Sequence, residues 1–261
     1  MARKPRVKAR SGVYHVVMQG VRHRDIFMDD EDYRRFVEIL EHLMVKRTKE
    51  DEEAERYFTL YAYCLMPDHF HLLVKEEADS VSVTMGRIAS AYAHYFNEKY
   101  DRDGAIYRAR FASEPVEDEG RMDIVIRFIS QSPERVMKRD ASEYCFSSWH
   151  EYVGEESELP RVCEIKEVYR QMAKEDLVKA LGTPVPKGVH CLGPRRVVKR
   201  PTDEQVLLML CQMREVAGMS EFLGLPRVVQ LRTLADLRRK GASVRQLERV
   251  TGIGRGVIQY L

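Results

Sequence analysis

The chain has 261 residues, of which 44% are hydrophobic and 32% charged, so one large or two small folded domains are possible and wholesale disorder is excluded. No run of about 18 apolar residues occurs, which argues against a membrane partner, and no apolar stretch follows the basic N-terminus as in a secretory signal. The five cysteines are scattered without a CxxC pair. We therefore expect a cytoplasmic protein with free thiols.

The net charge of +2 hides a strong asymmetry. Residues 1–24 hold seven basic and no acidic side chains, and residues 195–261 hold thirteen basic against six acidic ones. The intervening residues 25–194 hold 23 basic and 35 acidic side chains. Two basic ends on an acidic body favour contact with a polyanion, most simply nucleic acid, although a chance clustering of solubilising charges is the alternative.

Strands and helices alternate over the first 153 residues. The patterns predict strands at 11–19, 57–66, 69–75 and 105–111, and helices at 29–47, 80–100 and 119–131, the last of them limited by Pro133. This β-α-β-β-α-β order is typical of an α+β fold of ferredoxin-like type, in which helices pack on an antiparallel sheet. We expect this domain to span residues 1–153.

Residues 154–200 are expected to contain a connecting helix over 162–181 and then a linker rich in proline and glycine. Residues 201–261 are helical in pattern throughout and predict a separate all-α domain. In it Pro226 begins a helix that Gly241 ends, and Ser243 with Gln246 has the spacing of a capping box. A tight turn at 251–254 then precedes a last helix.

The end of this segment resembles a helix-turn-helix of the replication-initiator or repressor kind, which would contact duplex DNA in the major groove. A small bundle used for dimerisation is the alternative. The polar side chains expected to contact DNA are Arg245, Arg249, Arg255 and Gln259.

The stretch MPDHFHLLV, residues 66–74, carries the most chemical information. Alternate side chains of a strand share a face, so His69 and His71 point the same way, about 7 Å apart. They can converge on one divalent metal if another element supplies a third ligand. Two half-buried histidines on a sheet face without metal are the alternative.

Several segments around this strand are also characteristic: GVYHVVMQGVRHRDIFMDDEDYRRFVEIL, YAYCLMPDHFHLLV, AYAHYFNEKYDRDGAIYRARFASEPVEDE and CFSSWHEY. Together they resemble the HUH single-strand transposases, most closely the REP-associated tyrosine transposases, over residues 1–153. The resemblance implies a tyrosine that attacks a DNA phosphodiester, and Mg²⁺ or Mn²⁺ held by two histidines and a polar helix residue. It further implies a hairpin-bearing single-stranded substrate and no nucleotide cofactor. We also expect a homodimer.

The chain departs from this family at two positions. The family pattern is close to Tyr-Ile-x-x-Asn-Pro, and the matching residues 128–133 are FISQSP. Phe128 at the nucleophile position has no hydroxyl, and Ser132 at the ligand position is a weak donor to a hard cation. The sequence therefore predicts a transposase-derived protein that binds hairpin DNA with impaired catalysis and a weakened metal site.

Two alternatives keep an activity. A relocated nucleophile, Tyr107, Tyr144 or Tyr152, would leave an active strand transferase. A water-dependent nuclease would keep His69 and His71 and need Asp68 or Glu114 as third ligand. On the same helix Gln131 is displaced by about 100° from the ligand position and would need a helix irregularity to reach the metal.

Basic side chains surround the first predicted strand and are suited to neutralising phosphates without reading bases. A solvated tail is the alternative. Gln19 stands where the family usually has arginine, which weakens a phosphate contact. The seven basic residues are Arg3, Lys4, Arg6, Lys8, Arg10, Arg22 and Arg24.

Overall fold

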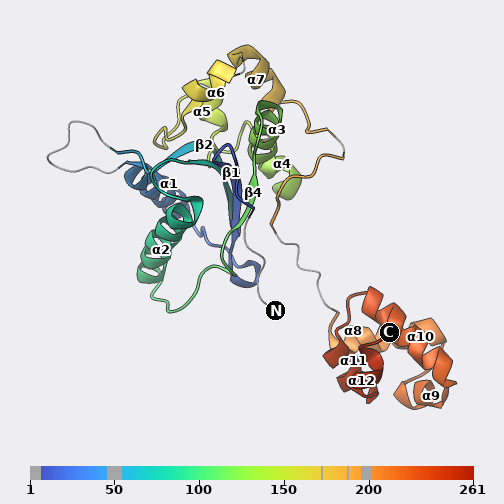
Figure 1. Ribbon diagram of the computed structural model, residues 1–261. Coiled ribbons are helices and arrows are strands. Elements are labelled where there is room, and N and C mark those ends of the chain that lie inside the picture. Colours follow the sequence, from blue (N-terminus) through green and yellow to red (C-terminus); the bar gives the residue numbers. More distant parts are fainter. Residues whose placement is uncertain (1–6, 46–54, 172, 187, 195–200) are drawn as a thin grey trace. The chain divides into compact units, whose positions relative to one another are not determined.

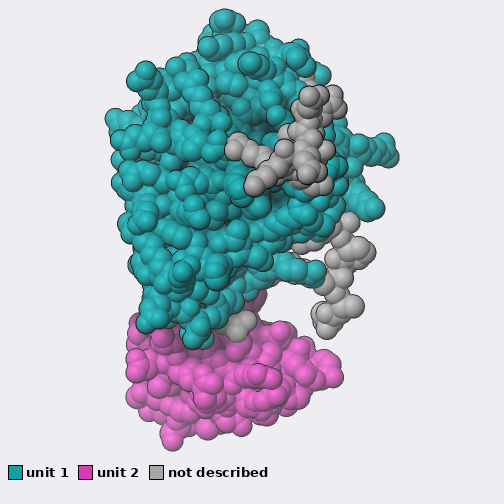
Figure 2. All heavy atoms as spheres, turned by 90° about the vertical axis from the view of Figure 1, so that its left-hand side faces the viewer, with its two compact units in different colours: residues 1–194 teal, residues 195–261 magenta. Residues whose placement is uncertain are grey.

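The computed structural model describes residues 7–45, 55–171, 173–186, 188–194 and 201–261. The chain divides into two compact units, Met1–Pro194 and Arg195–Leu261, which are coloured separately in Figure 2. No helix within the described ranges is long and apolar enough to cross a membrane. All five cysteines lie in those ranges and are free thiols, as expected.

Unit 1 is built on a four-stranded antiparallel sheet (Figure 1). Strands β1 (Val13–Gln19), β2 (Phe58–Met66), β3 (His69–Glu76) and β4 (Ala112–Pro115) lie in the order β2-β3-β1-β4. The first three agree with the predicted strands. The antiparallel α+β architecture is therefore confirmed for this unit.

The predicted strand at 105–111 is wrong. Within it only Tyr107 pairs, through a single bridge to Gly20, and the ladder with β1 begins at Ala112. Ile106 and Phe111 instead bury their side chains in the core. The sequence of β4 has little intrinsic strand preference, so its pairing is imposed by the position of the chain beside β1.

The turn after β1 contains the short 3-10 helix η1 (Val21–His23) and needs glycine at its start. A Cβ on Gly20 would lie 2.2 Å from the carbonyl oxygen of Arg24 and 2.9 Å from a side-chain carbon of Ile26. The Gly20 amide also donates to the carbonyl oxygen of Asp68 at 2.7 Å. This close approach fixes the turn against the start of β3.

Helices α1 (Asp30–Met44) and α2 (Val81–Lys99) cover one face of the sheet (Figure 1). The Asp29 side chain caps α1 by accepting from the backbone amide of Asp32. The apolar side of α1, with Phe36 and Leu40, packs on Phe70 and its neighbours in a first hydrophobic core. The remaining side chains of β3 therefore face the other side of the sheet.

The other face is covered by α3 (Glu119–Ser130), with a second core of its own. Pro133 does not simply end this helix as predicted. It lies in the first turn of a further short helix, α4 (Ser132–Met137), where proline is favoured because its missing amide has no partner to lose. α3 and α4 meet at Gln131.

Short helices complete this second core: α5 (Trp149–Val153), α6 (Ile165–Gln171) and α7 (Lys174–Leu181). The single connecting helix expected over 162–181 is thus two helices. They do more than connect, because Val168, Leu177 and Leu181 are buried in the second core. Their apolar side chains have the helical spacing that also fits one longer helix, so the pattern alone did not show the break.

Unit 2 is helical and has its own core, in which Leu210, Phe222, Leu234 and Leu247 are fully buried. Ser243 caps its helix by accepting from the amide of Gln246, but the predicted capping box is only half formed. The Gln246 side chain donates instead to Pro201 and Asp203. The helices are α8 (Asp203–Arg214), α9 (Met219–Gly224), α10 (Arg227–Arg239), α11 (Val244–Thr251) and α12 (Arg255–Ile258).

Candidate functional site

Three histidines lie on the sheet face that α3 covers. Because side chains alternate along a strand, His69 and His71 share a face while Phe70 between them enters the first core. His15 on β1 joins them, since the antiparallel register places it diagonally opposite His71. The ring centroids of His69 and His71 are 5.2 Å apart, and all three rings are at most 1% exposed.

Each histidine of the pair has its Nδ1 atom engaged. His69 Nδ1 lies 2.6 Å from Asp68 Oδ1, and His71 Nδ1 lies 3.0 Å from His15 Nε2. His69 Nε2 is buried and has no partner among the described residues. Both rings are thus oriented by a neighbour through Nδ1, which leaves Nε2 as the nitrogen for a ligand.

His15 is held in turn by Glu114, its direct cross-strand neighbour on β4. His15 Nδ1 lies 3.1 Å from Glu114 Oε1, which also accepts from Arg121 and from the Leu192 amide. A proton on Nδ1 toward the carboxylate makes Nε2 of neutral His15 an acceptor, so His71 donates to it from Nδ1. The Nε2 lone pair of His71 then stays available.

The pKa shifts agree with neutral rings and ionised carboxylates. Burial lowers the pKa of His71 well below its usual range, and repulsion from a protonated His15 or His69 would lower it further. Burial also lowers the pKa of His15, against the raising effect of Glu114. For Glu114 and Asp68 burial opposes ionisation, but hydrogen bonds outweigh it and both pKa values are lowered. Neutral imidazole is the form that binds metal.

Phe128 on α3 brings its ring to the histidines. Its ring centroid lies 5.9 Å from that of His15 and 5.8 Å from that of His71, both edge to face. The guanidinium carbon of Arg135 lies 3.8 Å from the same ring centroid. The residue that the sequence predicts at the nucleophile position is therefore next to the histidine pair, but it presents carbon and no oxygen there.

Ser132 and Gln131 direct their polar groups elsewhere. The Ser132 hydroxyl donates to the carbonyl oxygen of Phe128 at 3.1 Å and accepts from Arg135 at 2.9 Å. Gln131 donates to the carbonyl oxygens of Leu181 and Thr183, at 2.7 Å each, and so fixes the end of α7. Gln131 lies at the irregularity between α3 and α4, yet that irregularity serves this packing role.

A divalent metal would find two nitrogen donors on this face of the sheet. The orphaned Nε2 atom of His69 and the free Nε2 atom of His71 are suitable nitrogen donors. The proposed third position, Ser132, already uses its hydroxyl in two hydrogen bonds. Within the described ranges no group of three His, Cys, Asp or Glu side chains could hold a metal. The described residues therefore supply two of the three expected metal ligands.

The alternative third ligands and two of the alternative nucleophiles are held by other groups, whereas the hydroxyl of Tyr107 has no partner among the described residues but lies away from the histidines. Asp68 contacts Nδ1 of His69, and Glu114 contacts Nδ1 of His15, so each carboxylate orients a histidine ring. The hydroxyls of Tyr144 and Tyr152 donate to the carbonyl oxygens of Leu65 and Tyr61 at 2.6 Å. Tyr107 packs its ring on Phe70, on the opposite face of the sheet from the histidines.

The basic residues near β1 are accessible where they are described. Lys8, Arg10, Arg22 and Arg24 are exposed, and Arg22 has a left-handed backbone in η1. Arg3, Lys4 and Arg6 lie outside the described residues. Gln19 does not reach outward, since its amide donates to His23 at 2.8 Å and to Asp68 at 3.4 Å.

The four polar candidates of unit 2 are all exposed, but two are paired. Arg249 forms a two-pronged ion pair with Asp203 at 2.6 and 2.7 Å. Arg255 pairs with Glu248 at 2.8 Å. Arg245 and the Gln259 side chain have no hydrogen-bonding partner in the part of the chain that is described.

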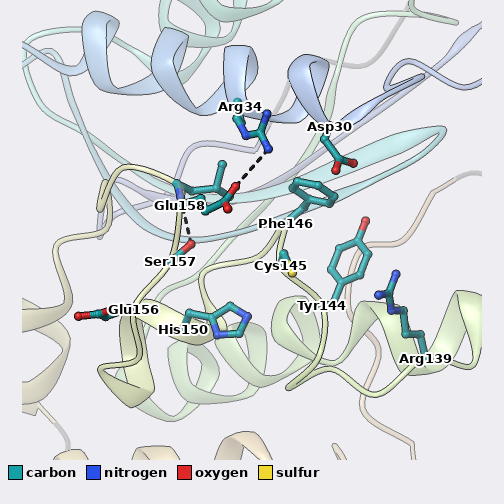
Figure 3. A pocket seen from close by; sticks show the side chains of 11 residues that line it. Asp30, Arg34, Arg139, Tyr144, Cys145, Phe146, His150, Glu156, Ser157 and Glu158 are labelled. Atoms are coloured by element: carbon teal, nitrogen blue, oxygen red, sulfur yellow. Dashed lines mark hydrogen bonds and ion pairs between the residues drawn. The ribbon is translucent and has the colours of Figure 1, made fainter.

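A separate pocket of about 560 Å³ lies between the start of α1 and the segments around residues 144–146 and 156–159. Figure 3 shows the rings of Tyr144 and Phe146 with Arg139 beside Tyr144, and the ion pair of Arg34 with Glu158 above them. None of the three site histidines lines it. Its lining mixes both charges with aromatic rings, so we assign it no ligand.

Comparisons with known proteins relate the first part of this chain to a known family. Residues 8–132 match the family model described as "Transposase IS200 like". No curated protein matches the chain significantly. A solved structure of a REP-associated tyrosine transposase bound to a REP hairpin is similar to this chain with 16% sequence identity and a TM-score of 0.47. That similarity covers 59% of this chain and 86% of the other.

Proposed function

We propose that residues 8–132, which match the family model described as "Transposase IS200 like", form a transposase-like domain that binds hairpin-forming single-stranded DNA but does not cleave it through residue 128. One observation carries the second half of this proposal. The ring of Phe128 occupies the place beside His71 where the family's tyrosine is expected, and a phenyl ring offers no oxygen to attack phosphorus.

A weakened metal site is part of the same proposal. His69 and His71 supply two nitrogen ligands. The hydroxyl of Ser132 is already hydrogen-bonded to the carbonyl oxygen of Phe128 and to the guanidinium of Arg135. A bound Mg²⁺ or Mn²⁺ would polarise the phosphate. With one ligand missing, the affinity for either metal is expected to be low.

We further propose that residues 1–153 form the transposase-like domain and residues 201–261 a DNA-binding domain, and that within residues 154–200 the helices α6 and α7 pack on the first of these. The element order and the strand order β2-β3-β1-β4 support a ferredoxin-like transposase domain. In unit 2, α11, the turn with Gly252 at a φ of 72°, and α12 support a helix-turn-helix that contacts duplex DNA. A homodimer remains part of the proposal.

The test is binding of a fluorescently labelled DNA hairpin with single-stranded flanks, measured with the full chain and EDTA present. The proposal predicts tighter binding of this hairpin than of a scrambled strand of equal length and composition. Equal affinity for the two strands would contradict hairpin recognition.

A further inference from the structure

The arginines near the histidine face differ in how their charge is balanced. Arg121 pairs with Glu114 at 3.1 Å, and Arg127 pairs with Asp123 at 3.3 Å. Arg135 makes no ion pair with any carboxylate of the described residues. It contacts only neutral acceptors, the carbonyl oxygen of Phe128 and the hydroxyl of Ser132. Its positive charge therefore has no paired counter-ion there, and Glu134 attracts it only at longer range.

The guanidinium of Arg135 is nevertheless held in place. It stacks on the Phe128 ring at 3.8 Å, and both of its hydrogen bonds use Nη2. The Nε and Nη1 groups have no partner in the described ranges, and the residue is exposed. An oriented arginine with free donors and no counter-ion is suited to an oxyanion with several acceptor oxygens.

We propose that Arg135 binds a phosphodiester group of the DNA strand, and that Phe128 is the platform that orients the guanidinium for it. This inference rests on the proposed single-strand binding and names the phosphate contact within it. The Phe128 ring also touches His15 and His71, so the bound phosphate lies beside the histidine pair. The charge of Arg135 contributes to the lowered pKa values of both histidines, in agreement with this proximity.

The contact needs no metal, because the guanidinium supplies the positive charge itself. Capping of α3 is the competing role, since Phe128 lies in the last turn of that helix and Arg135 donates to its carbonyl oxygen. A capping arginine would affect folding stability, whereas a phosphate ligand would affect DNA affinity and its salt dependence.

The experiment measures binding of a labelled twelve-nucleotide oligothymidylate by the full chain in EDTA, at several salt concentrations. Arg135→Gln should weaken binding about tenfold and reduce the salt slope by about 0.7, the value for one lost single-strand contact. Arg139→Gln is the matched control, because Arg139 is exposed, lies four residues on and only approaches the Tyr144 ring, at 5.8 Å. Its effect should stay within about twofold.

Two further variants separate the phosphate contact from folding. Arg135→Lys keeps the charge but not the stacked fork, so the salt slope should be retained while affinity falls. Phe128→Leu should weaken binding, and its effect should largely vanish in the Arg135→Gln background, because both changes remove one contact. Thermal unfolding of each variant identifies losses that come from folding.

Equal effects of Arg135→Gln and Arg139→Gln, or unchanged binding by Arg135→Gln, would overturn the phosphate site while the proposed function stands. A native chain that binds neither oligothymidylate nor the hairpin would overturn the proposed function as well.

Discussion

The Nε2 atom of His15 lies 3.0 Å from the Nδ1 atom of His71, and the two rings are stacked. This contact joins β1 to β3 below α3 and continues to Glu114 on β4. The orientation of one proposed metal ligand thus depends on the buried His15 and the half-buried Glu114, neither of which is proposed as a ligand. Such outer partners are as much a part of a metal site as its ligands.

Replacing His15 should therefore weaken metal binding without removing a ligand. His15→Ala should lower the Mn²⁺ affinity about tenfold or more, because His71 loses the partner of its Nδ1 atom. Titration calorimetry measures this directly, with His94→Ala as control, since His94 is exposed on α2. His15→Gln can still offer an oxygen to His71 and should restore part of the affinity. No difference between His15→Ala and the control would show that His15 has no positioning role.

The turn after β1 should tolerate no side chain at residue 20. Gly20→Ala should lower the free energy of unfolding by about 1–3 kcal/mol, because its Cβ would overlap the backbone of Arg24. Gly86→Ala in α2 is the matched control, with nothing within 4 Å of the added carbon, and should stabilise by about 0.5–1 kcal/mol. Urea unfolding of both variants measures the difference. If both substitutions changed the free energy of unfolding in the same direction, the close approach at Gly20 would be refuted.

We expect the buried carboxyl of Glu151 to lower the free energy of unfolding in a pH-dependent way. Its residue is 5% exposed, beside the second core. Burial raises the pKa of this carboxyl, against the lowering effect of the Cys163 amide that donates to it at 2.9 Å. Below the ordinary value of 4.5 both folded and unfolded chains hold the proton. As pH rises through the raised folded pKa, the folded state must accept a buried charge, so its stability falls.

Glu151→Gln should therefore stabilise the protein at pH 7 more than at pH 4. Denaturant unfolding of the variant and of the native chain at both pH values measures this difference. Glu143→Gln, at an exposed carboxyl, should change stability little at either pH. A Glu151→Gln effect independent of pH would show that the carboxyl carries no burial cost.

The two units should bind DNA through separate surfaces. Removal of residues 201–261 should lower affinity for duplex DNA and spare the hairpin single strand, because the cores of unit 1 include no residue of unit 2. Within unit 2, Arg245→Gln should reduce the duplex salt slope by about 0.9. Arg249→Gln is a useful comparison, because Asp203 already neutralises that arginine. Equal loss of duplex and hairpin binding on truncation would contradict the two-surface account.

The sequence predicted those parts of the fold whose local pattern agrees with their tertiary role. Strand alternation placed His69 and His71 on one face, and helical spacing placed Phe128 on α3. β4 was misplaced because Ala112–Pro115 pairs through its position beside β1, against its intrinsic preference. The α3–α4 break was missed because proline both stops helices and begins them.

His15 was the functional residue that sequence reasoning missed. Its signal was present, since it alternates with Tyr14 and Val16 and so shares a face with Val13 and Val17. Its importance depends on the register between β1 and β3, which a single sequence does not specify. The unpaired charge of Arg135 was also missed. A single sequence does not show which carboxylates lie near an arginine in the folded protein.

We propose that Phe128 stands at the nucleophile position and that its missing hydroxyl prevents cleavage, and one measurement tests this most directly. The native chain, Phe128→Tyr, and Phe128→Tyr with Ser132→Asn are each incubated with hairpin-flanked single-stranded DNA and Mn²⁺, and covalent protein–DNA adducts are sought by denaturing gel and peptide mass. The native chain should give none. Phe128→Tyr should give traces, and the double variant more than the two single changes together, because nucleophile and metal act on one phosphate. An adduct on any tyrosine of the native chain would contradict the account.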